Sequence, residues 1–514
     1  MSSRQSSIAS SAACATLLAW APFVVFLRHH GYGLWQPETL LAFALLALAG
    51  LAIGTLMEAA GGLGRVLGIA LLVSLLADLQ IERVERTGLL LAVFGLCALA
   101  GYALRRQLVP IVAVAAAGFC LASLLPGGGG GRAGELRREA GAAPASEAAP
   151  ILHLILDEAT SVDAIPPAFD PGGRVRAKLD DLLAEHDFNH YPRAYSRFVQ
   201  TRFSLAALFN GGEHRTTTAV GRDFALSANA YFDALAERGY ALRVHQTDFL
   251  DLCSASSAPR LLCTTHRLET PKAIEDTRIG LATKTGMLFA MLARRSSLVR
   301  LLGAEREGVR VASIVSMQTM TALADEAARL EPGRALIAHL MLPHFPYAYD
   351  ASCELRIDPE SWDHARLSAR RASRYSAESR KSRYPRYLAQ YECTIDRLGR
   401  IFGAMRASGI YERSWIVVHG DHGARISTHK PAPATRDQLS WLDYRDSFPT
   451  LLAVKAPGGA AHDDERRWAI DEIVPAALGI GERALPAQPA PPRVHLIGAQ
   501  RTMIGPLPEW VSVP

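Results

Sequence analysis

The chain of 514 residues has little charge imbalance, because 55 Lys and Arg stand against 50 Asp and Glu. A formal net charge of +5 is small for this size and argues against a nucleic-acid-binding protein. Cysteine is scarce, with seven residues and no Cys-x-x-Cys spacing, which argues against a cysteine-ligated zinc cluster. Internal repeats are absent, which excludes a solenoid or propeller.

The first quarter of the chain is instead rich in Leu, Ala, Val and Gly. Five apolar runs are present, at residues 12–27, 40–57, 63–81, 88–104 and 109–125. Their lengths are near the ~20 residues that cross a bilayer. A signal peptide would explain the first run but not the other four. We therefore predict a bundle of about five transmembrane helices over residues 1–125; a buried helical soluble domain is the alternative.

Five crossings would put the chain ends on opposite sides of the membrane, although the arginine bias across the loops is weak. Beyond the apolar runs the chain has four cysteines, Cys253, Cys263, Cys353 and Cys393. Their even number suits two disulfides, Cys253 with Cys263 and Cys353 with Cys393, in an oxidising compartment. Free buried thiols are the alternative.

Residues 126–150 begin with a Pro-Gly-rich stretch and predict a flexible linker. From residue 151 to about 484, strand-length apolar runs alternate with amphipathic stretches. This alternation predicts an α/β domain with a largely parallel sheet between helices. A Pro-rich tail, 485–514, follows. Strands are expected at 151–156, 240–245, 335–342, 415–419 and 450–454, and helices at 230–237, 387–408 and 467–478.

Metal-type ligands directly follow two of these predicted strands. Asp421 and His422 come after the strand at 415–419, and Asp157 and Glu158 come after the strand at 151–156. Carboxylate and imidazole are ligands that zinc and manganese accept. Sites in open α/β sheets lie at the carboxyl ends of strands, so these side chains predict a metal site of a hydrolase or transferase.

Four segments between residues 154 and 429 resemble the alkaline phosphatase and sulfatase superfamily. The best resemblance is to its membrane-anchored branch, the phosphoethanolamine transferases and lipoteichoic acid synthases. These have five crossings and an outward catalytic domain. The resemblance implies an α/β sandwich of alkaline phosphatase-like type. It also implies a divalent ion, Zn²⁺ first, with Mn²⁺, Mg²⁺ or Ca²⁺ as alternatives. The implied metal ligands are Asp157, Glu158, Thr201, Asp421 and His422; Asp157 capping the following turn is the alternative for that residue.

The resemblance also implies catalytic roles. Thr201, followed three residues later by Ser204-Leu205, corresponds to the nucleophile of the transferases; the alternative is that Thr201 only caps a helix. His344 would line the substrate pocket, whereas His339, inside the strand, is expected to be a core imidazole. His429 and Arg425 would hold phosphate oxygens, with a surface role as the alternative for Arg425. The Cys/Ser-x-Pro-x-Arg pattern of sulfatases is absent, which favours phosphoryl transfer.

A basic stretch interleaved with tyrosines, containing Arg366, Arg370, Arg371, Arg374, Arg380, Lys381, Arg383 and Arg386, is either a solvated helix face or a surface for anionic lipid headgroups. We expect a multi-pass protein of the plasma (inner) membrane with its catalytic domain on the periplasmic or extracellular side. It would transfer a phosphoethanolamine- or phosphoglycerol-like group to an envelope lipid or glycan. The alternatives are a phosphoric or sulfuric ester hydrolase and a non-catalytic envelope scaffold. The sequence does not indicate an oligomeric state.

Overall fold

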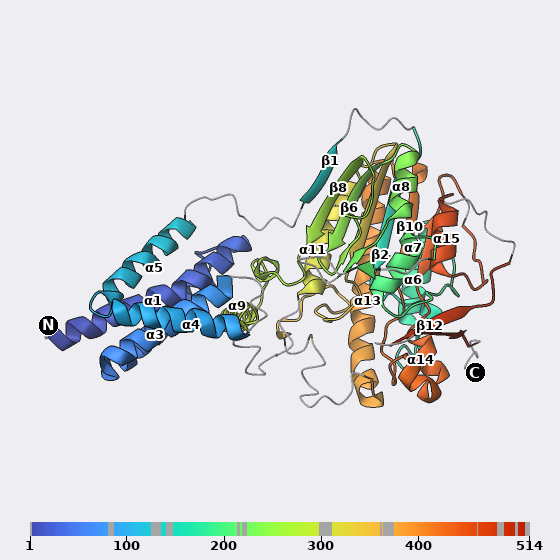
Figure 1. Cartoon of the computed structure of the whole chain (residues 1–514). Helices are drawn as coiled ribbons and strands as arrows, with labels where there is room; N and C mark the ends of the chain where they lie inside the picture. The colour runs from blue at the N-terminus through green and yellow to red at the C-terminus, as the bar shows by residue number, and fades with distance from the viewer. Residues whose placement is uncertain are drawn as a thin grey trace. The chain divides into compact units, whose positions relative to one another are not determined.

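The structure is a computed structural model of the whole chain (Figure 1). It describes residues 3–80, 87–124, 135–139, 147–212, 216–217, 224–297, 311–359, 362, 375–459, 461–480, 488–498 and 502–508. Two compact units are present, each described by itself. The first comprises Met1–Arg132 and Glu269–Val311, and the second Ala133–Leu268 and Ala312–Pro514.

The first unit is helical. Its five N-terminal helices are α1 (Ser3–His29), α2 (Pro37–Ala59), α3 (Gly61–Gln80), α4 (Thr87–Ala103) and α5 (Leu108–Leu124). All five predicted apolar runs form helices. Three stretches, Gln5–His29, Pro37–Ala59 and Gly61–Leu79, are long and apolar enough to cross a membrane. The helices α4 and α5 have 17 residues each, so a total of five crossings stays a prediction.

Helices α1 and α2 approach closely because two glycines, Gly50 and Gly54, face the α1 backbone. A Cβ at Gly50 would lie 2.7 Å from Thr16 Cα, and one at Gly54 would lie 2.5 Å from Ala12 Cα. Small residues four apart allow such contacts between apolar helices, where packing replaces the hydrophobic effect as the driving force. This sequence signal therefore explains the close helix pair.

A segment far along the chain, Glu269–Val311, also belongs to the helical unit. Its helix α9 (Leu281–Ala293) packs against α2, and Phe289 contacts Phe23 with ring centroids 5.6 Å apart. The Lys284 ammonium lies 3.7 Å from the Glu38 carboxylate, and both side chains are less than a tenth exposed. The Glu275 carboxylate accepts a 2.6 Å hydrogen bond from the Gly33 amide. The sequence pattern did not indicate this insertion.

The second unit contains a mixed sheet. In spatial order its strands are β1 (Glu135–Glu139), β8 (Arg260–His266), β6 (Ala241–Thr247), β9 (Arg334–Leu340), β2 (Ile151–Leu156), β10 (Trp415–Gly420), β11 (Leu452–Lys455) and β3 (Asn189–His190). The five strands β8, β6, β9, β2 and β10 are mutually parallel. The outer strands β1 and β11 pair antiparallel with β8 and β10, and β3 pairs antiparallel with β11, so the largely parallel sheet is confirmed with antiparallel pairing at both edges.

Helices of the second unit pack on its sheet (Figure 1). The helices α7 (Thr201–Phe209), α8 (Ala230–Glu237) and α15 (Ile470–Ala477) share a core with Ile151 and Ile155 of β2. Side chains alternate along a strand, so Leu152 and Leu154 point to the opposite face. The helix α13 (Ala377–Ala407) packs with both α6 (Arg174–Glu185) and α11 (Ala312–Ala327), and α11 contacts β9.

Part of the predicted linker has regular structure. Residues 135–139 form β1 and pair with β8, so the expectation of a flexible linker is wrong for them, whereas 126–134 and 140–146 lie outside the described residues. In the predicted tail, β12 (Arg493–Ile497) and β13 (Thr502–Pro506) form a hairpin. Val494 and Leu496 are buried against Tyr195 and Phe448. The chain beyond residue 485 therefore contributes to the core.

Both predicted disulfides are present in the second unit. Cys253 is bonded to Cys263, and Cys353 to Cys393, with sequence separations of 10 and 40 residues. The alternative of free thiols is therefore wrong for these four cysteines. Closing a loop restricts the unfolded chain, and the longer loop loses more entropy.

We predict that replacing Cys353 and Cys393 together with serine lowers the free energy of unfolding by roughly 4 kcal/mol, against roughly 3 kcal/mol for Cys253 and Cys263. Denaturant unfolding of the two double variants measures the difference. Equal stability of the Cys353/Cys393 variant and the parent chain would contradict the structural role of this disulfide.

Candidate metal centre

Three neighbouring parallel strands bring metal-type ligands to one edge of the sheet. In the ladder, Ile155 of β2 lies opposite both His339 of β9 and His419 of β10. Asp157 and Asp421 each come two residues after their strand's member of this row, so they lie on the same face. Single ligand atoms of Asp157, His339 and Asp421 all lie within 4.8 Å of one another, and all three residues are buried.

Asp157 points both of its carboxylate oxygens into this group. Oδ2 accepts a hydrogen bond of 3.3 Å from the Thr201 hydroxyl, whereas Oδ1 has no hydrogen-bond partner and is buried. Oδ1 also lies 3.8 Å from Nε2 of His422. The side chain therefore faces the candidate site and does not cap the following turn.

Asp421 and His422 are held by the backbone around them. Asp421 Oδ1 accepts a hydrogen bond from the Glu158 amide at 3.0 Å, and its carbonyl accepts one from Ser204 at 2.6 Å. His422 Nδ1 lies 2.9 Å from the Gly423 carbonyl, which can only accept, so Nδ1 carries the proton. The lone pair of Nε2 is then free to face the site, 3.2 Å from Asp421 Oδ2.

Thr201 is the first residue of α7, and its hydroxyl enters the same group. Oγ1 lies 3.3 Å from Asp157 Oδ2 and 3.3 Å from His422 Nε2. The helix cap is Gln200, so Thr201 is not used as a cap. A phosphoryl group on this oxygen would lie near the positive end of the helix, where anions are favoured.

His339 lies in a strand and is buried, as predicted, but its surroundings differ from the expectation. It was expected to be a core imidazole with satisfied partners. In the structure both of its ring nitrogens are buried without a hydrogen-bond partner, and Nε2 lies 3.9 Å from Asp157 Oδ2. Burial lowers the pKa of His339 to about 4, so the ring is neutral and can act as a ligand. Its register position opposite Ile155, once strand pairing is known, is the signal that identifies it.

The electrostatics of this group favour a cation. Burial raises the pKa of Asp157 well above its usual range, and the neighbouring Asp421 carboxylate raises it further. Burial likewise raises the pKa of Asp421. Two carboxylates this close in a dry site cannot both ionise easily without a positive charge between them.

The donor set fits a divalent ion. It comprises the carboxylate oxygens that lack hydrogen bonds, Asp157 Oδ1 and Asp421 Oδ2, with the imidazole nitrogens of His422 and His339 and the hydroxyl of Thr201. Mixed nitrogen and oxygen ligands are typical of zinc and manganese.

Glu158, predicted as a ligand, has a different position. Its Oε1 accepts a hydrogen bond of 2.8 Å from Nε of Arg425 and lies 3.7 Å from Nε2 of His344. The Arg425 guanidinium also lies 3.2 Å from that His344 nitrogen. The backbone of Glu158 has φ of 63°, and its carbonyl accepts a hydrogen bond from Tyr387. Glu158 therefore joins a polar cluster with Arg425, which was predicted to hold phosphate oxygens, and His344, which was predicted to line the substrate pocket. The surface alternative for Arg425 is wrong, because its side chain is 18% exposed.

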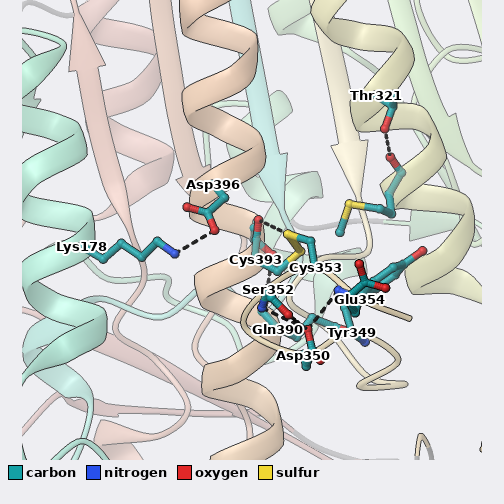
Figure 2. Close-up of a disulfide and its surroundings, with 12 residues drawn as sticks. Lys178, Thr321, Tyr349, Asp350, Ser352, Cys353, Glu354, Gln390, Cys393 and Asp396 are labelled. Carbon is teal, nitrogen blue, oxygen red and sulfur yellow. Dashed lines mark hydrogen bonds and ion pairs between the residues drawn. A yellow bond between two sulfur atoms is a disulfide. The ribbon is translucent and has the colours of Figure 1, made fainter. Parts of the chain in front are cut away.

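The loop that carries His344 is tied to α13. The side-chain amide of Gln390 donates to the carbonyls of Pro343 and His344, at 3.1 and 2.9 Å. Figure 2 shows Gln390 beside the Cys353–Cys393 disulfide, which links the same loop to the same helix. A covalent bond and a buried amide thus hold this loop.

Two further predictions concern His429 and the basic stretch. His429 Nδ1 lies 3.1 Å from Asp443 Oδ2, and its side chain is 42% exposed; its part in phosphate binding stays a prediction. In the basic stretch, Arg380 pairs with the buried Asp446, and Arg383 is itself buried. The reading of the stretch as one solvated or lipid-facing surface is wrong for these two. Arg366, Arg370, Arg371 and Arg374 lie outside the described residues.

Comparison with known protein families finds no match, and comparison with curated proteins finds none either. Solved structures do share similarity with this chain. A protein of the alkaline phosphatase superfamily from Vibrio parahaemolyticus is 12% identical, with a TM-score of 0.39 over 73% of this chain and 76% of that one. A phosphonate monoester hydrolase from Silicibacter pomeroyi is 15% identical, with a TM-score of 0.39 over 68% and 79%. A 2-O glycosaminoglycan sulfatase is 13% identical, with a TM-score of 0.41 over 67% and 72%.

The glycine before Asp421 provides a test of the tight packing at this edge. A Cβ on Gly420 would lie 2.1 Å from the Ala159 carbonyl oxygen, whereas one on Gly403, in α13, would meet nothing within 4 Å. We predict that Gly420→Ala destabilises the chain by about 3 kcal/mol or more through overpacking. Gly403→Ala is expected to stabilise it by about 0.5–1 kcal/mol. Thermal unfolding of both variants measures this, and equal midpoints would contradict the packing.

Proposed function

We propose that this chain is a membrane-anchored, metal-dependent enzyme that transfers a phosphoryl-linked group, with Thr201 as the nucleophile. The observation that carries the proposal is the position of the Thr201 hydroxyl, 3.3 Å from Asp157 Oδ2 and 3.3 Å from His422 Nε2. A hydroxyl buried between a carboxylate and a neutral imidazole is placed for deprotonation.

The reaction would proceed in two displacements. Thr201 Oγ1 loses its proton and forms a bond to the phosphorus of a phosphodiester, while the bond to the leaving alcohol breaks and that alcohol takes up a proton. An acceptor hydroxyl then loses its proton and attacks the same phosphorus, while the bond to Oγ1 breaks and Oγ1 takes up a proton. The divalent ion, when bound by Asp157, Asp421, His422 and Thr201, with His339 beside them, supplies a lowered hydroxyl pKa and neutralises phosphate charge.

Charge on the transferred group would be stabilised by Arg425 and His344. The guanidinium is held by Glu158 and the imidazole by the loop tied to Gln390, so both side chains are positioned before substrate arrives. Donors positioned in advance, in a site that excludes water, contribute more to catalysis than mobile ones.

The membrane-anchored branch of the alkaline phosphatase superfamily is the proposed family. Its support is the convergence of four of the five predicted ligands, Asp157, Thr201, Asp421 and His422, from three segments, of which those of Thr201 and His422 are 221 residues apart. An ester hydrolase with the same site is the second candidate, and it differs only in using water as the acceptor. A scaffold without chemistry is disfavoured, because a fold alone has no need for buried carboxylate oxygens that lack hydrogen bonds.

The substrate proposed is a lipid headgroup donor, with an envelope lipid or glycan as acceptor. Three candidate spans support membrane attachment, and two disulfides support an oxidising, periplasmic or extracellular location for the catalytic unit. Attachment to the bilayer would raise the effective concentration of a lipid donor.

Thr201→Ala is predicted to reduce turnover of a fluorescent phospholipid donor at least ~10³-fold, because no oxygen remains to take the phosphoryl group. Covalent phosphorylation of the protein, read by intact mass, should disappear. The control is Thr319→Ala in α11, which removes a buried hydroxyl bonded only to the Val315 carbonyl. Undiminished turnover by Thr201→Ala would overturn the nucleophile. Donor consumption with free headgroup as the sole product would favour the hydrolase.

Metal removal gives an independent test. Chelation should abolish turnover and lower the thermal midpoint, because Asp157 and Asp421 lose the cation between them. Returning Zn²⁺ or Mn²⁺ should restore both. At a free-ion concentration of 100 times Kd, the expected gain in stability is about 2.7 kcal/mol. If elemental analysis shows that the protein holds no metal and its turnover is still complete, the proposed metal site is contradicted.

A further inference from the structure

A series of buried hydrogen bonds leads through the core to the residue before Asp421 and takes no part in the proposed chemistry. The Tyr231 hydroxyl of α8 lies 3.0 Å from Nδ1 of His153 in β2. Nε2 of His153 lies 2.8 Å from Nε2 of His419 in β10, and Nδ1 of His419 lies 2.7 Å from the Gly420 carbonyl. All three side chains are at most 2% exposed.

The carbonyl acceptor at one end of this series of hydrogen bonds determines which atom carries the proton in each bond. A carbonyl can only accept, so His419 Nδ1 donates to Gly420. Both imidazoles are buried in the core, where the charged form is disfavoured. In the neutral ring of His419, Nε2 is then an acceptor, so His153 Nε2 donates to it. His153 Nδ1 therefore accepts from the Tyr231 hydroxyl. This single arrangement satisfies every polar atom of the three side chains.

The chain of hydrogen bonds ends at a peptide bond of the metal centre. Gly420 immediately precedes Asp421, and its carbonyl belongs to the peptide that links the two residues. Because a carbonyl cannot pass a proton onward, the chain is not a proton relay. Its remaining effect is to fix the orientation of the peptide that leads into Asp421.

We propose that Tyr231, His153 and His419 are positioning residues for the metal ligand Asp421, an inference that rests on the proposed function for the presence of the metal. They act through the Gly420 carbonyl and touch neither metal nor substrate. Partners outside the set of ligands orient metal-binding side chains elsewhere, and their loss lowers metal affinity by roughly 10–100-fold. In this protein the partners are core residues, and they act on Asp421 through the preceding peptide bond.

The experiment measures Zn²⁺ affinity of the full-length chain in detergent by competition with a chromogenic chelator. Tyr231→Phe removes only the hydroxyl at the start of the chain. Its matched control is Tyr411→Phe, since the Tyr411 hydroxyl is equally buried and bonds the His186 carbonyl at 2.6 Å. Tyr411 precedes β10, roughly 17 Å or more along the strand from Asp421.

We expect Tyr231→Phe to weaken Zn²⁺ binding several-fold and Tyr411→Phe to leave it unchanged, while both lower the thermal midpoint by similar amounts. A second pair of variants tests the middle of the chain. His153→Leu should weaken Zn²⁺ binding by roughly 10-fold or more. His153→Gln, whose amide can still donate to His419, should recover most of the affinity.

Equal Zn²⁺ affinities for Tyr231→Phe and Tyr411→Phe, or no difference between His153→Gln and His153→Leu, would overturn the positioning role. If the parent chain binds Zn²⁺ but transfers no phosphoryl group, the proposed function is overturned. The Zn²⁺ affinities of the variants then still decide the positioning role. A parent chain that binds no Zn²⁺ would overturn both.

Discussion

The burial of two carboxylates at one sheet edge is the constraint on which the rest of the structure depends. Asp157 and Asp421 are at most 1% exposed, and each has an oxygen without a hydrogen bond. Leaving such groups charged and unmatched costs several kcal/mol, so their burial together favours either a proton or a cation between them, and the group could hold a metal ion. The neutral imidazoles of His422 and His339 and the Thr201 hydroxyl supply the remaining donors that such an ion takes.

Rigidity around this site has several independent sources. Gly420 permits β10 to pass against the Ala159 carbonyl, and the buried histidine pair orients the peptide that follows. On the other side, α13 provides Tyr387 to hold the Glu158 carbonyl and Gln390 to hold the His344 loop. Such supports limit the motion of ligands whose charges would otherwise drive them apart.

Much of this organisation could be predicted from the sequence. Strand-length apolar runs followed by acidic residues located β2 and β10, and the alternation of strands with helices indicated the parallel sheet. Asp157, Asp421 and His422 were predicted because side chains directly after parallel strands meet at one edge, whereas Thr201 was predicted from the resemblance to the transferases. The number and positions of the cysteines predicted both disulfides, and the structure excluded the alternative of free thiols. Glu158 contacts Arg425 and His344, and its role as a ligand stays a prediction, because adjacent residues after a strand point in different directions and the sequence does not show which one faces the ion.

The sequence by itself determined what is local: the apolar helices, the buried strands, the residue types at the strand ends and the threonine at a helix start. These follow from hydrophobic periodicity and chain position. Only the tertiary structure decided which strands are neighbours, and therefore that His339 faces Asp157 and that His153 meets His419. It also decided that residues 269–311 join the helical unit. Register and long-range pairing depend on the packing of the whole sheet, and no local pattern encodes them.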